Sequence, residues 1–247
     1  MIDDISYKTS MPIANVKVKV QSITLRHQIV GEIRKAILAG SLLPGERVVE
    51  RALAAKVGAS VTAAREALIQ LESEGLITKR SNTTTNITSL THEEIAQTFA
   101  VRRSLERLAV AEAAHRATES SVQHLTGLHD LAVEAATRRD PQLYVQRDFA
   151  WHHAIWLASR NDVLANTLRR LVLPLFGFSI IQVVSHPSFD LLEDAQLHAP
   201  ILHAIARRDA TAAVAAFEDG LHAWTTHVRE QPAFQMKEHP PCVAAGD

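Results

Sequence analysis

Apolar residues recur at helical spacing from the first third of the chain onward. Ile29, Ile33 and Ile37 lie four positions apart, which predicts a helix over residues 25–40. Gly40 is placed to end that helix, because glycine adopts the left-handed backbone of a helix C-terminus without strain.

A compact set of short elements follows this helix. The pattern predicts helices over 50–57 and 60–73 and strands over 76–78 and 85–88. Gly58 separates the two helices, and Ser60 can cap the second one. Three helices followed by a hairpin make a winged helix-turn-helix, in which the third helix can enter the major groove of DNA.

In the remainder of the chain, apolar residues recur only at helical spacing. The predicted helices cover 92–117, 119–138, 141–159, 161–184 (kinked at Pro174), 189–208 and 210–230. The fold class is therefore mostly α. The predicted organisation is an N-terminal extension (1–20), a winged helix-turn-helix domain (21–90), an all-helical bundle (91–231) and a loose tail (232–247).

Charge is divided unevenly between these parts. The 247 residues hold 26 Lys and Arg against 27 Asp and Glu, which excludes a strong overall field. Residues 1–80 hold 12 basic and 8 acidic residues, a balance of +4, and residues 81–247 hold 14 and 19, a balance of −5. This asymmetry favours two modules with different partners, although a basic excess of this size also occurs on ordinary solvated surfaces.

Several features bear on the compartment. Cys242 is the single cysteine and cannot form an internal disulfide, which fits a reducing cytosol. The N-terminus lacks the apolar segment of a secretory signal. The longest apolar stretch, 171–184, is too short and too interrupted to span a bilayer. These features predict a cytoplasmic protein without a membrane partner.

The predicted recognition helix carries side chains suited to DNA. Ser60, Thr62 and Arg65 lie at its start, where hydroxyls and a guanidinium reach phosphates and base edges. Arg47 and Arg51 precede it on the supporting element. A three-helix packing unit without a DNA partner shares this generic pattern, so the spacing alone leaves both interpretations open.

The longer string over 33–77 resembles the DNA-binding domain of the GntR family of bacterial transcription regulators. The matching residues are Gly40, Leu42, Pro44, Gly45, Leu53, Ala54, Gly58, Ser60, Arg65, Glu66, Ala67, Leu68, Leu71, Gly75 and Leu76. Three departures are Val61 for the usual arginine, Ala63-Ala64 for Pro-Val, and no glycine at 82–84 in the wing. The resemblance implies the fold and binding to a double-stranded operator, but not the operator sequence.

Histidines and one aspartate suggest a metal site in the bundle. Asp148 and His152 lie four positions apart, on one face of one predicted helix, and His198 and His222 lie on later helices. A carboxylate and three imidazoles from three helices could hold a borderline divalent cation. With 13 histidines, spacing alone favours ordinary surface or core positions over a metal site, and His153 is a competing neighbour.

Residues 92–230 resemble the FCD ligand-binding domain of the FadR subfamily of GntR regulators. The match includes Asp148, Trp151, His152, Ile155, Ser159, Asn161, Leu164, His198, Ile201, Leu202, Ile205, Asp209, Ala213 and His222, with Arg102, Leu105 and Glu106 earlier. The resemblance implies Asp148, His152, His198 and His222 as metal ligands. It also implies Arg102 as the partner of a small carboxylate effector. Zinc is the favoured metal, with nickel or manganese also compatible. Six predicted helices suggest the shorter, VanR-like branch.

Arg102 and Glu106 lie one turn apart on a helix whose Leu105, Leu108 and Ala109 are expected to face the interior. Arg102 therefore either bridges Glu106 or awaits an anion, and the resemblance favours the anion. The predicted function is a homodimeric repressor that reads a two-fold operator and senses a small carboxylate, which would reorient the DNA-binding domains through the linker near 89–91. A metal-dependent enzyme acting on a carboxylate and a metal-free helical-bundle interaction protein are the alternatives.

Overall fold

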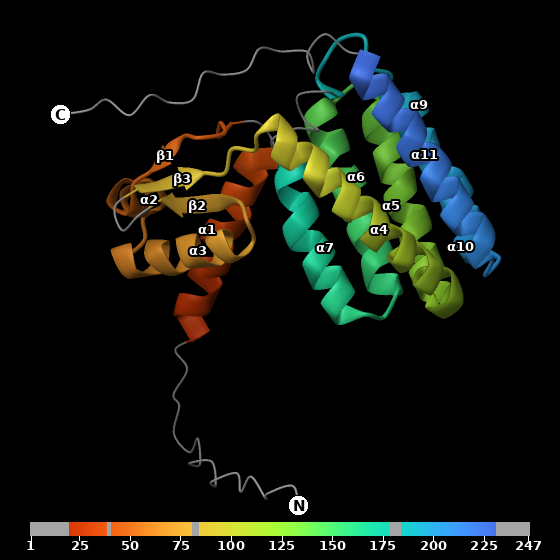
Figure 1. The fold of residues 1–247 in the computed structure, drawn as a ribbon. Coiled ribbons are helices and arrows are strands. Elements are labelled where there is room, and N and C mark those ends of the chain that lie inside the picture. Colours follow the sequence, from red (N-terminus) through yellow and green to blue (C-terminus); the bar gives the residue numbers. More distant parts are fainter. Residues whose placement is uncertain (1–19, 39–40, 81–83, 178–183, 231–247) are drawn as a thin grey trace, which may run out of the picture.

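The computed structural model describes residues 20–38, 41–80, 84–177 and 184–230 of the chain, as a small domain with a sheet beside a larger bundle of helices (Figure 1). The predicted extension 1–20, apart from Val20, and the predicted tail 232–247 lie outside the described residues. Gly40, the wing residues 82–83 and Cys242 also lie outside them. Within the described residues, no helix is both long and apolar enough to cross a membrane.

The small domain is the predicted winged helix-turn-helix. Its helices are α1 (Val20–Leu38), α2 (Glu50–Val57) and α3 (Val61–Ser73), and its strands are β1 (Arg47–Val48), β2 (Ile77–Arg80) and β3 (Thr84–Ile87). The strands form an antiparallel sheet in the order β1-β3-β2, with Asn86 opposite both Arg47 and Thr78. The pattern predicted the hairpin β2–β3 but not β1, because a strand of two residues has no alternation to detect.

Local chemistry accounts for the turn between α2 and α3. Gly58 ends α2 with φ +64°, in the left-handed region that glycine adopts without strain. Ser60 then caps α3, its side chain accepting a hydrogen bond from the Ala63 amide. Ile33 and Ile37 of α1 are buried in the core, as their four-residue spacing predicted, and α1 packs against α3.

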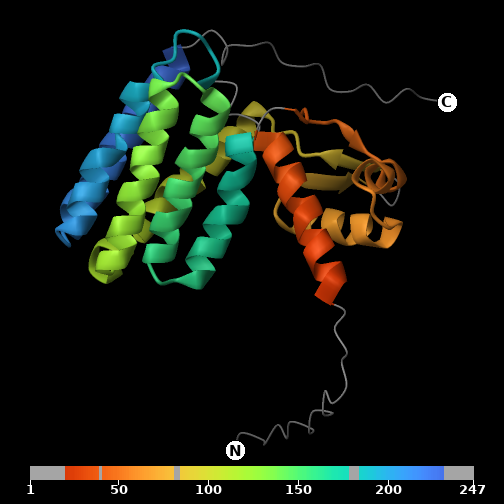
Figure 2. The same cartoon turned by 180° about the vertical axis from the view of Figure 1, so that it is seen from behind.

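The larger domain is all helical in its described part. Its helices are α4 (His92–Arg116), α5 (Glu119–Thr137), α6 (Pro141–Ala158), α7 (Asp162–Leu175), α9 (Leu191–Gln196), α10 (His198–Ala206) and α11 (Ala210–Glu230). Thr91 and Glu94 form a capping box at the start of α4, each side chain bonded to the other's backbone amide. Helices α5, α6 and α7 lie side by side on the face seen in Figure 2, and α4 crosses the opposite face (Figure 1).

One predicted helix was wrong. The segment 189–208 is two helices, α9 and α10, separated at Leu197, so the described part of the bundle holds seven helices rather than six. Pro200 supplies the reason, since it has no amide hydrogen to donate to the carbonyl of Gln196. The helix count therefore no longer supports the shorter branch. Helix α7 ends at Leu175, before the predicted end at 184, and 178–183 lie outside the described residues.

The two domains touch along α1 and α7 (Figures 1 and 2). A Cβ added at Gly177, two residues past the end of α7, would lie only 2.6 Å from Cγ2 of Ile37 on α1. A Cβ at Gly75, just after α3, would lie 3.3 Å from both the carbonyl oxygen of Arg170 and Cγ of Pro174. Glycines at these two positions allow the backbones of the two domains to approach closely.

Candidate metal centre and nucleic-acid interface

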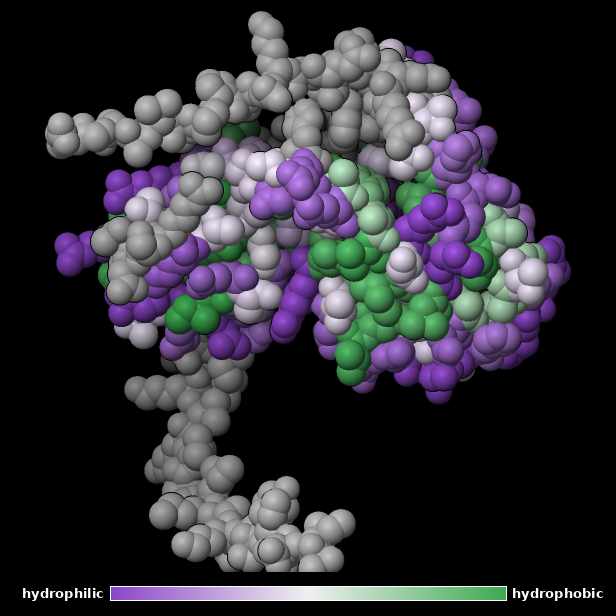
Figure 3. All heavy atoms as spheres, in the orientation of Figure 1, coloured by the Kyte–Doolittle hydropathy of each residue, from purple (hydrophilic) through white to green (hydrophobic). Residues whose placement is uncertain are grey.

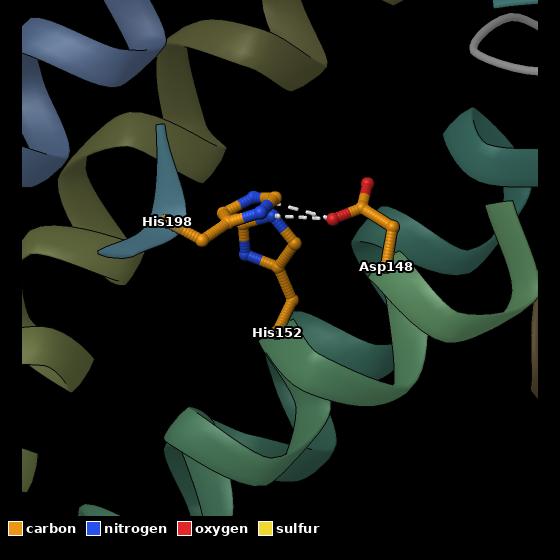
Figure 4. Close-up of side chains that lie close together, drawn as sticks. All are labelled: Asp148, His152 and His198. Carbon is orange, nitrogen blue, oxygen red and sulfur yellow. Dashed lines mark ion pairs between the residues drawn. The ribbon is translucent and has the colours of Figure 1, made fainter. Parts of the chain in front are cut away.

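Three of the four predicted metal ligands meet in the interior of the bundle. Asp148 and His152 project from consecutive turns of α6, and His198 is the first residue of α10. One potential ligand atom from each lies within 4.8 Å of the other two. Both imidazole rings point toward the Asp148 carboxylate (Figure 4). All three residues are buried, with at most 8% of their surface exposed.

The atoms at the centre of this cluster suit a divalent cation. Nε2 of His198 lies 3.2 Å and Nε2 of His152 lies 3.7 Å from Oδ1 of Asp148, yet that buried oxygen accepts no hydrogen bond. Burial, followed by the nearby His152, lowers the pKa of His198 well below its ordinary value, which keeps the ring neutral. A carboxylate oxygen and two imidazole nitrogens form a donor set for zinc or a similar ion, so the residues fit a metal.

His222 is not brought to this group. It lies on the exposed side of α11, whose inward face is formed instead by Phe217, Gly220, Leu221 and Trp224. Those four positions follow helical spacing, and His222 lies two residues past Gly220, about 200° round the helix. The periodicity of α11 therefore contained the signal that His222 points outward. The neighbour His153 stacks on Phe149, away from the cluster.

The predicted effector residue borders the same cavity. Arg102 is only 4% exposed and lines a cavity of about 50 Å³ together with Asp148, His152 and His198. Its Nε donates a hydrogen bond to Oε2 of Glu106 at 2.6 Å. The guanidinium carbon lies 5.5 Å from the ring centroid of Phe176, a cation–π contact. Arg102 thus has the predicted ion pair and also faces the cavity.

Glu106 connects the arginine to the metal cluster. Its Oε1 lies 3.1 Å from Nδ1 of His152 and accepts a hydrogen bond from Nε1 of Trp156 at 2.9 Å. Burial alone would raise the pKa of Glu106, but the charges of Arg102 and His152 and their hydrogen bonds lower it to about 2. Glu106 therefore stays ionised inside the bundle. Of the apolar neighbours expected to face inward, Ala109 is buried, Leu105 is half-buried and Leu108 is exposed.

One acidic residue of the cavity wall was not predicted from the sequence. Asp194 on α9 is buried, accepts a hydrogen bond from the Tyr144 hydroxyl at 2.7 Å and lines the cavity. Burial and the nearby Asp148 raise the pKa of Asp194 to about 7. Asp194 precedes His198 by four residues, as Asp148 precedes His152, and this repeated spacing is the signal that could have identified it.

The predicted DNA-binding side chains lie on the surface of the small domain. Arg47 on β1, Arg51 in the first turn of α2, Ser60 as the N-cap of α3, and Thr62 and Arg65 in α3 are all exposed. The hydroxyl of Ser60 accepts one hydrogen bond as a cap and keeps its own hydrogen for a phosphate. Arg65 is held by Glu50, with Nε 3.0 Å from Oε2, so DNA has to compete with that ion pair.

Comparison with known proteins agrees with the two domains. Residues 25–87 match the model described as bacterial regulatory proteins, gntR family, and residues 97–223 match the FCD domain. A protein of Paenarthrobacter nicotinovorans described as "Probable D-xylose utilization operon transcriptional repressor" is 27% identical over 207 residues, covering 83% of this chain and 86% of the relative. The Escherichia coli regulator McbR is 24% identical over 153 residues, 62% of this chain and 69% of McbR.

The solved structure of E. coli McbR/YncC has the same fold. It superposes with a TM-score of 0.71 over 85% of this chain and 97% of that one, at 18% identity. The winged helix-turn-helix, the helical bundle and both family matches lead to one assignment. The chain belongs to the GntR family of bacterial transcription regulators and carries an FCD domain behind its DNA-binding domain.

Proposed function

We propose that this regulator is a metal-dependent repressor whose operator binding responds to a small carboxylate. The observation that carries the proposal is the shared cavity, because Arg102 and the cluster of Asp148, His152 and His198 line the same space. The relative from P. nicotinovorans, described as a repressor, supports the direction of control. We place the protein in the cytoplasm, where its operator is.

The chemistry of the cavity favours an anionic ligand. Three protein ligands leave coordination positions open, and a bound divalent ion would attract the oxygens of a carboxylate there. Arg102 offers a second, bidentate partner for such a group. A cavity of about 50 Å³ holds a few atoms, so the effector is small or displaces neighbouring side chains on binding. Zinc is the proposed metal, and nickel or manganese also suit the ligands.

Control of DNA binding requires a path from the cavity to the small domain. Phe176 borders the cavity beneath Arg102, and the next residue, Gly177, packs against Ile37 of α1. A movement of Phe176 on effector binding would therefore press directly on α1, in addition to acting through the linker at 89–91. Such control requires that the effector bind the two domain arrangements with different affinities.

A homodimer would match a two-fold operator. Apolar side chains gather on the face formed by α4 and α7 (Figure 3). Val101 and Leu108 on α4 are nearly half exposed, and Val163 on α7 is 78% exposed. Leu108 was expected in the interior, and the exposure of this leucine on α4 supports an interface with a second copy. Sedimentation of Leu108→Glu beside the parent protein tests it, since a parent-like dimer mass would contradict this interface.

The decisive experiment combines metal analysis with operator binding. Purified protein is expected to contain one divalent ion per subunit, and a thermal-shift screen of small carboxylates then identifies ligands of the metal-loaded form. In a gel shift, such a ligand should release the operator from the metal-loaded protein and not from the chelated protein. Protein that binds no metal would contradict the metal centre and support the metal-free alternative.

The DNA interface has its own test. Arg51→Ala and Arg65→Ala should each weaken operator binding by about tenfold or more at fixed salt, with unchanged circular dichroism. Arg116→Ala, which removes an exposed arginine at the end of α4, is the control. Unchanged operator affinity in both variants would show that α2 and α3 do not face the DNA.

A further inference from the structure

Glu106 is only 1% exposed and contacts three side chains: Arg102 and His152, which line the cavity, and Trp156, which is fully buried. We propose that Glu106 is a positioning residue that sets both the metal-facing nitrogen of His152 and the anion-facing side of Arg102. Metal affinity and carboxylate affinity would then depend on one buried carboxylate. The inference rests on the proposed function and adds a residue that touches neither the metal nor the effector.

The contact with His152 decides which of its ring nitrogens carries the hydrogen. An ionised carboxylate only accepts hydrogen bonds, so Oε1 of Glu106, 3.1 Å from Nδ1 of His152, places the hydrogen on Nδ1. The lone pair of the neutral ring is then on Nε2. That is the nitrogen that lies 3.7 Å from Asp148 in the ligand cluster (Figure 4). A carboxylate bonded to the far nitrogen of a metal-binding histidine also makes the ring a stronger ligand.

The contact with Arg102 fixes the direction of its guanidinium. Glu106 accepts from Nε through Oε2 at 2.6 Å, and the rings of Phe99 and Phe176 lie 5.6 and 5.5 Å from the guanidinium carbon. Bonding through Nε leaves the two Nη groups, the pair that a carboxylate binds in bidentate fashion, for the cavity. Trp156 donates to Oε1 at 2.9 Å and so prevents the Glu106 carboxylate from rotating away.

A purely structural role for Glu106 makes different predictions. A carboxylate that served only as counter-ion to Arg102 would influence stability, but not the hydrogen position on His152 or the affinity for metal. Glu106→Gln separates the two roles, because the amide keeps the shape but offers one oxygen where the carboxylate offers two. Glu112→Gln is the matched control, since Glu112 pairs with Arg116 on the same helix, away from the cavity.

The first measurement needs no metal. Nitrogen-15 NMR of the metal-free protein at about pH 8, where an ordinary histidine is neutral, should show the hydrogen of His152 on Nδ1. The signal is assigned by its loss in His152→Gln. In Glu106→Gln the hydrogen should move wholly or partly to Nε2, and in Glu112→Gln it should stay. A hydrogen on Nε2 of His152 in the parent protein would overturn the proposal without any variant.

The second measurement is metal affinity by competition with a coloured chelator, using Zn²⁺ alone. Glu106→Gln should bind Zn²⁺ about 10- to 100-fold more weakly than the parent, the usual effect of removing such a partner, and Glu112→Gln should match the parent. Parent-like affinity in Glu106→Gln would overturn the proposal. A parent protein that binds no Zn²⁺ would instead contradict the proposed function, and the NMR result would still decide the role of Glu106.

Discussion

Two buried glutamates, Glu106 and Glu74, are each held by arginine but serve different parts of the molecule. The partners of Glu106 described above, Arg102, His152 and Trp156, all lie inside the bundle, on α4 and α6. Glu74, at the end of α3, pairs with Arg34 of α1 at 2.7 Å and with Arg169 of α7 at 2.9 Å. Glu74 therefore joins the DNA-binding domain to the bundle, whereas Glu106 organises a site within one domain.

The two carboxylates differ in how costly it is for each to lose a charged partner. The partners of Glu106 are closed off from water, so removing one of them leaves a charge without compensation in the interior. Arg34 and Arg169 keep 29% and 28% of their side-chain surface exposed, so water can replace either of them at modest cost. The partly exposed contacts of Glu74 can therefore open and close during regulation. The buried contacts of Glu106 preserve a fixed geometry.

Removing Arg102 should have the largest effect. Arg102→Ala leaves Glu106 buried without its arginine, and we expect a loss of about 3–5 kcal/mol in the free energy of unfolding, measured in urea. The surviving folded protein should no longer respond to the effector in a gel shift. Arg102→Lys should also respond poorly, since a point charge cannot reproduce the bidentate fork. Arg103→Ala, at an exposed neighbouring position, is the control. If the effector still released the operator normally from the Arg102→Ala protein, Arg102 would not belong to the effector site.

Removing one metal ligand tests the site that Glu106 supports. His198→Ala should lower metal content, measured by mass spectrometry, and should abolish the rise in melting temperature that metal produces, because metal that binds the folded state stabilises it. The comparison is His222→Ala, which alters an exposed position on α11 and should behave like the parent. Metal loss in His222→Ala with full occupancy in His198→Ala would reverse the assignment.

Removing Arg169 tests the joint between the domains. Arg169→Ala takes away the bundle's share of the Glu74 network but leaves Arg34, so the free energy of unfolding should fall by only about 1 kcal/mol. Effector-induced release of the operator should change more than stability does, because the lost contact crosses the domain boundary. Arg170→Ala, an exposed neighbour, is the control. A stability loss as large as that of Arg102→Ala would contradict the distinction between the two glutamates.

The smallest expected effect is on pH dependence. Burial would raise the pKa of Glu74, but the hydrogen bond and charge of Arg34 and the charge of Arg169 lower it overall. The folded state therefore takes up this proton at lower pH than the unfolded state, whose glutamates titrate near about 4.3. The stabilisation is present above that pH and is lost as the pH falls through the lowered pKa.

The measurement compares unfolding free energies of the parent and Glu74→Gln between about pH 7 and pH 3. Their difference should be constant at neutral pH and should shrink below about 4.3. The contribution of Glu106, whose pKa is about 2, should persist to lower pH. A difference that grows on acidification would mean that the pKa of Glu74 is raised rather than lowered.

Local signals predicted most of the secondary structure and much of the site. Helical spacing, the Gly58 turn and the Ser60 cap predicted α2 and α3, and the i, i+4 pair Asp148–His152 predicted two neighbouring ligand positions on α6. Pro200, which splits α9 from α10, is also a local signal, although the pattern of apolar residues concealed it.

The sequence by itself determined which residues share a turn of helix, because backbone geometry relates positions that are three or four residues apart. The tertiary structure alone decided which helix faces meet. It brought His198 to Asp148, placed Glu106 against His152 and brought Glu74 to Arg169. These contacts depend on how the apolar faces of helices that are distant in the sequence pack against one another, and no local spacing specifies that packing.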